Sequence, residues 1–259
     1  MRLDAFLVEK KYFETRSKAQ DAIQKGLVKV NGKAIQKNSY PVNEDMEIHV
    51  EQEDIAFASR AGFKLYDVLE PFEISLKHRT VIDVGASTGG FSDVCLKEGA
   101  DFVYAVDVGK DQLLPRLRED SRVCCMEGVN CRYLTKEKFD RPIDFACMDV
   151  SFISIKLILP ALFSIMSKKE LVVLIKPQFE AGKKNIGKNG VVKDEKVHIQ
   201  VLKDIVSFVE DAGLYVKHLC ASSILGRDGN KEFVMHIVEN PCHCVFSYKQ
   251  IVKDYVVKR

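Results

Sequence analysis

The sequence predicts an α/β protein: a Rossmann-like, mostly parallel sheet of seven strands, preceded by a small α+β module. Three observations support this fold class. From Thr80 onward, apolar strand-like runs alternate with helical patterns, as in parallel sheets covered on both faces. One run, Val81–Val84, leads directly into the glycine-rich stretch Gly85–Gly90. The first fifty residues instead have the spacing of two short helices and a hairpin.

Charge and cysteine content narrow the class of protein. The net charge of the 259 residues is only +2, but residues 1–43 hold nine Lys and Arg against four Asp and Glu. Six acids and no Lys or Arg follow in 44–54, so we expect a separate basic module. The eight cysteines form no CxxC pair, which favours buried thiols in a reducing cytosol and no metal site.

The elements of the basic module follow from spacing and turn chemistry. Apolar residues at helical intervals predict a first helix within 2–11. Thr15–Ser17 can cap a second helix, which Gly26 ends. Asn31-Gly32 between two short apolar runs is a strong hairpin signal, and residues 46–50 alternate as a further strand. A core of this size is marginal, so we expect a docked partner or RNA to complete its order.

The second part begins with a helix and continues as the large sheet. Ser59 can cap a helix that carries Lys64 and stops at Pro71. Asp194 can cap a long helix before the last two strands, which we expect to be antiparallel. The strands predicted from apolar runs are Val81–Val84, Phe102–Asp107, Val123–Met126, Ile143–Asp149, Glu170–Lys176, Leu214–Cys220 and Glu232–Val238.

The glycine-rich stretch predicts a cofactor at the carboxyl ends of the strands. Ser87 stands where the nicotinamide fingerprint has its second glycine, which disfavours a dinucleotide. Asp107, 24 residues after Asp83, ends the second strand and suits a ribose diol. The pattern resembles class I methyltransferases that use S-adenosylmethionine. That resemblance assigns cofactor contacts to Asp83, Gly85, Ser87, Gly89, Gly90, Phe91, Asp107, Asn130 and Asp149.

The basic module resembles the S4 RNA-binding domain. It has Arg-Leu-Asp at 2–4, Arg-Ser-Lys-Ala-Gln at 16–20 and Gly-x-Val-x-Val-Asn-Gly-Lys at 26–33. In that family these segments face RNA phosphates, which position a protein without reading sequence. A second basic stretch, 183–190, either closes over RNA or cofactor, with Arg227 and Lys231 on the same rim, or is a plain exposed loop. The expected RNA contacts are Arg2, Arg16, Lys18, Lys29, Lys33, Lys183, Lys184 and Lys188.

Four charged residues point to the reaction. A ribose hydroxyl is a poor nucleophile, so its methylation needs a base beside the methyl group. A lysine becomes usable as a base where burial and a second cation lower its pKa. The order Lys64, Asp149, Lys176, Glu232 resembles the Lys-Asp-Lys-Glu tetrad of FtsJ-like 2′-O-ribose methyltransferases. By this resemblance Lys176 is the base, and the other three orient and tune it.

Other methyl acceptors fit the sequence less well. Methyltransferases that act on base amines often carry an Asn/Asp-Pro-Pro-aromatic run after the fourth strand, where this chain has Asp149-Val150-Ser151-Phe152. A carbon-5 mechanism needs a nucleophilic cysteine, and Cys147 is expected to lie too deep in the sheet. A ribose hydroxyl is therefore the expected acceptor.

Both halves together resemble the TlyA family along nearly the whole chain. The resemblance implies 2′-O-methylation of cytidine in ribosomal RNA within ribosomal subunits, by a cytoplasmic monomer that needs no membrane. The expected divisions are an S4-like domain (1–51), a linker (52–59), a methyltransferase domain (60–241) and a C-terminal extension (242–259) like that of the longer members. Two alternatives stay open: a membrane-active haemolysin and a non-enzymatic RNA-binding assembly factor.

Overall fold

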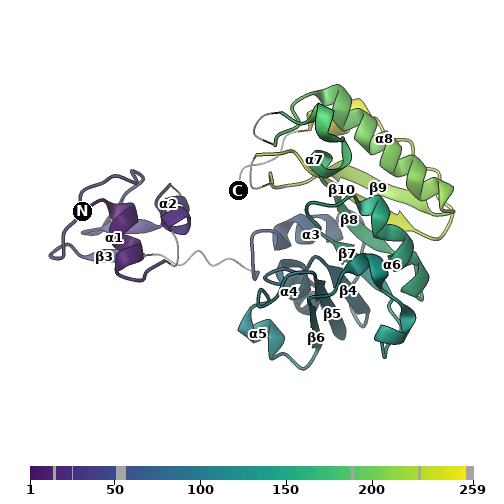
Figure 1. The fold of residues 1–259 in the computed structure, drawn as a ribbon, viewed down its shortest axis with the longest axis horizontal. Helices are drawn as coiled ribbons and strands as arrows, with labels where there is room; N and C mark the ends of the chain where they lie inside the picture. The colour runs from purple at the N-terminus through teal and green to yellow at the C-terminus, as the bar shows by residue number, and fades with distance from the viewer. Residues whose placement is uncertain (14–15, 25, 51–56, 188–189, 227–228, 255–259) are drawn as a thin grey trace. The chain divides into compact units, whose positions relative to one another are not determined.

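The chain divides into two compact units, Met1–Ala56 and Phe57–Arg259 (Figure 1). The computed structural model describes residues 1–13, 16–24, 26–50, 57–187, 190–226 and 229–254. Within these residues no helix is both long and apolar enough to cross a membrane. Each unit has its own hydrophobic core, so each is built as a separate folding element.

The first unit packs two helices on a three-stranded antiparallel sheet of order β2-β1-β3. Its elements are α1 (Leu3–Glu9), α2 (Arg16–Gln24), β1 (Val28–Val30), β2 (Lys33–Ala34) and β3 (Ile48–Val50). Asn31 and Gly32 have φ values of 49° and 76°, which a type I′ hairpin requires at both central positions. The hairpin predicted from Asn-Gly is therefore present, and Leu3, Leu7 and Ile23 are buried beside it.

The second unit is built on a seven-stranded sheet of order β6-β5-β4-β7-β8-β10-β9 (Figure 1). Only β10 runs antiparallel to its neighbours. The predicted sheet of seven mostly parallel strands, with an antiparallel last pair, is confirmed. The strands are β4 (Thr80–Val84), β5 (Phe102–Asp107), β6 (Val123–Glu127), β7 (Phe145–Met148), β8 (Leu171–Ile175), β9 (Tyr215–Ala221) and β10 (Phe233–Val238).

Helices cover both faces of this sheet, as the alternation of strands and helices predicted. Strand residues alternate between two cores: Ile82 and Val84 pack on one side, with α6, α8 and α9, and Val81 on the other, with α3, α4 and α5. The helices are α3 (Gly62–Leu69), α4 (Gly90–Lys97), α5 (Pro115–Arg118), α6 (Leu159–Ile165), α7 (Pro177–Glu180), α8 (Glu195–Asp211) and α9 (Tyr248–Lys253). Short 3₁₀ turns add η1 (Cys131–Tyr133), η2 (Lys136–Lys138), η3 (Ile155–Leu157) and η4 (Lys183–Asn185).

Two predicted caps have different outcomes. Asp194 caps α8 as expected, because its side chain accepts a hydrogen bond from Lys196 N. Ser59 does not cap α3, whose N-cap is Ala61, and this prediction was wrong. The Ser59 side chain instead packs against Gly90, where a Cβ atom would lie 2.3 Å from Ser59 Oγ. Gly90 therefore permits a close crossing of α3 and α4 beside the cofactor loop.

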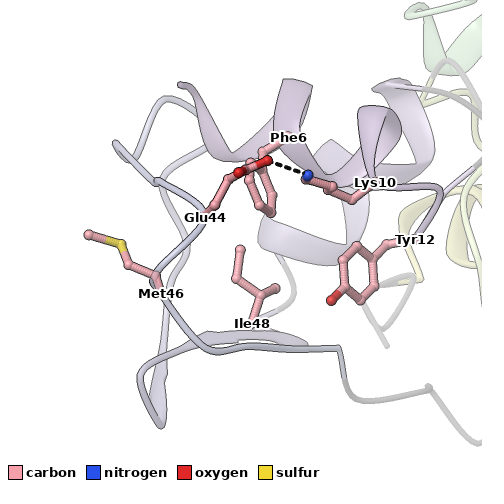
Figure 2. Close-up of a pocket in the computed structure, with 6 residues that line it drawn as sticks. All are labelled: Phe6, Lys10, Tyr12, Glu44, Met46 and Ile48. Carbon is pink, nitrogen blue, oxygen red and sulfur yellow. Dashed lines mark hydrogen bonds and ion pairs between the residues drawn. The ribbon is translucent and has the colours of Figure 1, made fainter.

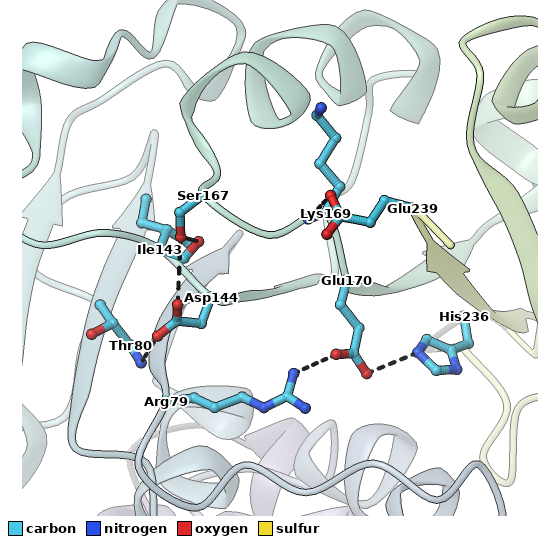
Figure 3. A network of polar contacts seen from close by, with 9 residues as sticks. All are labelled: Arg79, Thr80, Ile143, Asp144, Ser167, Lys169, Glu170, His236 and Glu239. Carbon is cyan, nitrogen blue, oxygen red and sulfur yellow. Dashed lines mark hydrogen bonds and ion pairs between the residues drawn. The ribbon is translucent and has the colours of Figure 1, made fainter. Parts of the chain in front are cut away.

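A polar network closes the sheet at the edge where the parallel strands begin (Figure 3). Glu170 accepts a hydrogen bond from Arg79 Nη1 at 2.6 Å and lies 3.3 Å from His236 Nε2. Burial raises the pKa of Glu170, but the bonds from His236 and Arg79 outweigh it and lower that pKa to about 2. The network ties β4, β8 and β10 together at the edge opposite the predicted site.

Candidate active site

Three strand ends and one strand start bring predicted catalytic and cofactor residues to one edge of the sheet. Asp107 ends β5, Asp149 follows β7, and Lys176 follows β8. Since β10 runs antiparallel, its first residue lies at this same edge, and Phe233 pairs with Ile175. That register puts Glu232 beside Lys176, although 56 positions separate them in the sequence.

The four residues of the predicted tetrad form one continuous charged chain. Lys64 Nζ lies 2.6 Å from Glu232 Oε2 and 3.6 Å from Asp149 Oδ2. Lys176 Nζ lies 2.5 Å from Asp149 Oδ1. Both lysines are 8% exposed and Glu232 is 2% exposed, so the chain is almost closed to solvent. Two ammonium groups and two carboxylates balance in charge, which satisfies the requirement that buried charges be paired.

The two lysines differ in their partners. Burial lowers the pKa of Lys64, but the carboxylates of Asp149 and Glu232 outweigh burial and raise that pKa above its usual value. The surroundings of Lys64 therefore favour its ammonium form. Lys176 donates a hydrogen bond to Ser151 Oγ at 3.0 Å, and its contact with Asp149 Oδ1 is an ion pair outside hydrogen-bond geometry. No pattern in the sequence indicates a role for Ser151.

The glycine loop forms as predicted, as a tight turn between β4 and α4. Gly85 and Gly89 have φ values of 84° and 94°, and a Cβ atom at Gly85 would lie 2.6 Å from Asp149 O. Asp83 lies beneath the loop, and its Oδ2 accepts hydrogen bonds from Ser92 N and Oγ. Burial, opposed by those bonds, raises the pKa of Asp83 to about 7.

This loop fits the amino-acid end of S-adenosylmethionine. Asp83 Oδ1 is buried, and no donor in the described structure meets it with hydrogen-bond geometry. An unpaired acceptor suits the cofactor's ammonium group, and the N–H groups at the start of α4 suit its carboxylate. The Phe91 side chain is buried in the core, so the cofactor contacts predicted for Gly90 and Phe91 would be made by the backbone.

The next two strands present the groups predicted for the nucleoside. Asp107 accepts hydrogen bonds from Ser87 N at 2.8 Å and Gly109 N at 2.7 Å, which fix its carboxylate at the strand end. A carboxylate has about four lone-pair positions, so it can still accept ribose hydroxyls. Asn130 is exposed, follows β6, and its side chain accepts a hydrogen bond from Arg132 N. These residues stay predicted contacts.

An exposed aromatic ring lies next to the tetrad. Phe152 is 90% exposed and has a φ of 65°, a conformation that bulky residues rarely adopt. Its ring centroid lies 5.1 Å from that of Phe179. Glu180 fixes the segment, because it accepts hydrogen bonds from Ser154 Oγ at 2.6 Å and Ile155 N at 2.8 Å. The sequence shows this ring in the run after Asp149, but that run by itself argues only against amine methylation.

Two predicted RNA contacts in the first unit share one carboxylate. Asp4 is fully buried and pairs with Arg2 and with Arg16, each at 3.0 Å. The hydrogen bond from Arg2, opposed by burial and supported by Arg16 and Gln20, holds the pKa of Asp4 well below its usual value. The guanidinium groups are held in place, yet their side chains remain 52% and 54% exposed. No pattern in the sequence indicates that Asp4 is the ion-pair partner of both arginines.

The remaining predicted RNA contacts differ in their exposure to solvent. Lys33 and Lys184 are exposed, and Lys29 is half-buried in β1. The side chains of Lys18 and Lys183, and residues Thr15, Lys188 and Arg227, lie outside the described part of the chain. The Lys231 ammonium donates to Val252 O and Asp254 O, at the end of α9, and its place on the rim stays a prediction. The extension after 241 is thereby tied to the start of β10.

A separate hollow of about 450 Å³ opens on the first unit (Figure 2). Apolar side chains line it, and the Lys10–Glu44 ion pair crosses its rim at 2.5 Å. It contains none of the predicted catalytic or cofactor residues. The six residues that line it are Phe6, Lys10, Tyr12, Glu44, Met46 and Ile48.

Comparison with known proteins agrees with both units. The FtsJ-like methyltransferase family matches residues 57–238, and the S4 domain family matches residues 1–48. The chain is 44% identical over 238 residues to the rRNA methyltransferase-named protein YqxC of Bacillus subtilis, covering 91% of this chain and 85% of that protein. It is 36% identical to the 16S/23S rRNA (cytidine-2′-O)-methyltransferase TlyA of Mycobacterium tuberculosis, covering 90% and 88%.

A solved structure supports the same assignment. A hemolysin-named protein of Streptococcus thermophilus is 42% identical, with a TM-score of 0.78 over 97% of this chain and 94% of that one. Resemblance over nearly the whole length, in both units, identifies the family. The chain belongs to the FtsJ-like methyltransferase family, as an S-adenosylmethionine-dependent member of the TlyA type with an N-terminal S4 domain.

Proposed function

We propose that the protein methylates the 2′-hydroxyl of a cytidine in ribosomal RNA, within ribosomal subunits, with Lys176 as the base. The observation that carries this proposal is the buried Glu232–Lys64–Asp149–Lys176 chain beside the glycine loop. The name of the Mycobacterium tuberculosis relative supports the choice of cytidine and of ribosomal RNA. Since its substrate would be ribosomal subunits, the protein acts in the cytoplasm, and we expect it to act as a monomer.

The tetrad divides the work of proton removal. The bound cofactor supplies an electrophilic methyl group. Lys176, as the free amine, would accept the proton of the 2′-hydroxyl, so that its oxygen could take up the methyl group that the bound cofactor would supply. Asp149 stabilises the ammonium that forms on Lys176. Lys64, held as a cation by Glu232 and Asp149, fixes the position of the Asp149 carboxylate.

Other acceptors meet physical obstacles at this site. Cys147 is fully buried, its thiol lies 3.9 Å from that of Cys95, and burial raises its pKa well above the usual value. A thiol in that state is a poor nucleophile, which disfavours attack on a pyrimidine carbon. A hydroxyl acceptor needs a base, and the buried lysine Lys176 of the tetrad is our candidate for it.

Two features suit RNA as the carrier of that hydroxyl. The half-exposed guanidinium groups of Arg2 and Arg16 are pre-oriented by Asp4, as phosphate contacts require. The exposed ring of Phe152 beside the tetrad suits stacking of an unpaired base, and stacking contributes about 1–3 kcal/mol per base. Phosphate contacts would position the RNA, and the ring would hold the target nucleotide at the site.

The test is product identification after tritiated methyl transfer to purified small and large subunits. We expect label in 2′-O-methylcytidine, in dinucleotides that resist alkali because the neighbouring hydroxyl is blocked. Label on a base, or no label on either subunit, would contradict the proposed substrate. The hemolysin name of the Streptococcus thermophilus relative supplies the alternative arm, in which the purified protein lyses erythrocytes without methylating RNA.

A further inference from the structure

We propose that Ser151 is a positioning residue for Lys176, and that it fixes the direction of the lysine's lone pair. This inference rests on the proposed role of Lys176 as the base. Ser151 Oγ accepts a hydrogen bond from Lys176 Nζ at 3.0 Å. In the described structure this is the hydrogen bond that Lys176 makes with proper geometry, because its contact with Asp149 Oδ1 is an ion pair only.

Rotation about the Cε–Nζ bond of Lys176 sets the direction of its lone pair. A neutral lysine amine has two N–H bonds and one lone pair, in three staggered positions. Ser151 Oγ takes one position as the acceptor of an N–H. The carboxylate of Asp149 attracts the second N–H and repels a lone pair. The lone pair is then left with the third position, so the base is aimed before the substrate binds.

The backbone around Ser151 is rigid enough to serve as such a reference. Val150 is buried, and its Cγ1 would lie 3.1 Å from a Cβ atom at Gly85. Phe152 follows in the left-handed region, and Glu180 holds Ser154 on the other side. Ser151 thus lies in a segment fixed on both sides, and it is itself an exposed residue.

Charged groups from three elements surround the lysine on its other sides. Asp149 follows β7, Lys64 lies on α3, and Glu232 precedes β10. Without Ser151 the amine is free to turn about its Cε–Nζ bond, and its lone pair is less well aimed at the substrate. Substrate binding does not depend on that direction, so kcat should fall while KM stays unchanged. A purely structural role would not separate kcat from KM in this way.

The experiment measures kcat and KM for Ser151→Ala and Ser151→Thr on ribosomal subunits. For Ser151→Ala we expect about a tenfold lower kcat and an unchanged KM. Ser151→Thr keeps the hydroxyl and should restore kcat. Ser164→Ala is the matched control, since its hydroxyl bonds to Ala161 O on the exposed side of α6.

Cofactor binding and melting temperature show whether each variant is folded. A Ser151→Ala enzyme with wild-type kcat would overturn the inference while Lys176→Ala remains inactive. Full activity of Lys176→Ala would instead overturn the proposed function itself. The two failures are therefore distinguishable.

Discussion

Replacing Asp149 by Asn tests the electrostatic design of the tetrad, because it removes one charge and preserves the shape. Asp149 is the carboxylate shared by both lysines, at 2.5 Å from Lys176 and 3.6 Å from Lys64. The three side chains are only 9–12% exposed, so water screens the pairs poorly. The variant leaves two buried ammonium groups with Glu232 as their remaining carboxylate in the tetrad.

The size of the effect follows from the burial. Removing one partner of a buried ion pair costs about 3–5 kcal/mol, and we expect about 3 because Lys64 keeps its 2.6 Å contact with Glu232. For a unit of this size, that free energy of unfolding corresponds to a melting temperature lower by about 6–12 °C. Methyl transfer should fall about 10³-fold, as loss of a component of general base catalysis does.

Differential scanning calorimetry and methyl transfer to subunits measure the two effects. A second variant, Asp149→Asn with Lys64→Met, restores the charge balance and should regain part of the stability but none of the activity. An Asp149→Asn protein that melts within about 1 °C of the wild type and retains its kcat would show that Asp149 neither stabilises the two lysines nor supports methyl transfer.

Three further predictions concern stability and RNA binding. Glu170→Gln should lower the free energy of unfolding by about 2 kcal/mol at pH 7, measured by urea unfolding. Because the folded pKa of Glu170 is about 2, this stability is present above its unfolded pKa near 4.5 and is lost as pH falls toward 2. The free energies of unfolding of the two proteins should therefore become equal near pH 2. A difference in free energy of unfolding that persists at pH 2 would show that the Glu170 carboxylate is not its source. Arg16→Ala should raise KM for subunits and reduce the slope of log affinity against log salt by about 1, with kcat unchanged; an unchanged slope would exclude a phosphate contact. Phe152→Ala should leave the melting temperature unchanged but lower kcat/KM about tenfold, and Phe152→Tyr should restore it; equal activity of all three proteins would exclude stacking.

The sheet could be predicted because its signals are local. Each strand is an apolar run bounded by turn residues, and Asp194 and Asn31-Gly32 specify their cap and turn within a few positions. The edge that carries the site follows from the direction of the strands alone. The antiparallel return of β10 then places Glu232 beside Lys176 without any knowledge of side-chain contacts.

The features that could not be predicted depend on packing between distant segments. Ser59 fails as a cap because it meets Gly90, 31 positions later in the sequence. Lys231 reaches the carbonyls of α9, and Asp4 collects two arginines from different elements. Ser151 gained a role only from its 3.0 Å contact with Lys176. A sequence pattern names such residues but does not specify their partners.

Single-turnover methyl transfer by Lys176→Ala shows whether Lys176 removes the proton from a ribose 2′-hydroxyl. With tritiated S-adenosylmethionine and saturating subunits, we expect the variant to react at least about 10²-fold more slowly than the wild type, with cofactor affinity retained. Equal rates for Lys176→Ala and the wild type would exclude Lys176 as the base.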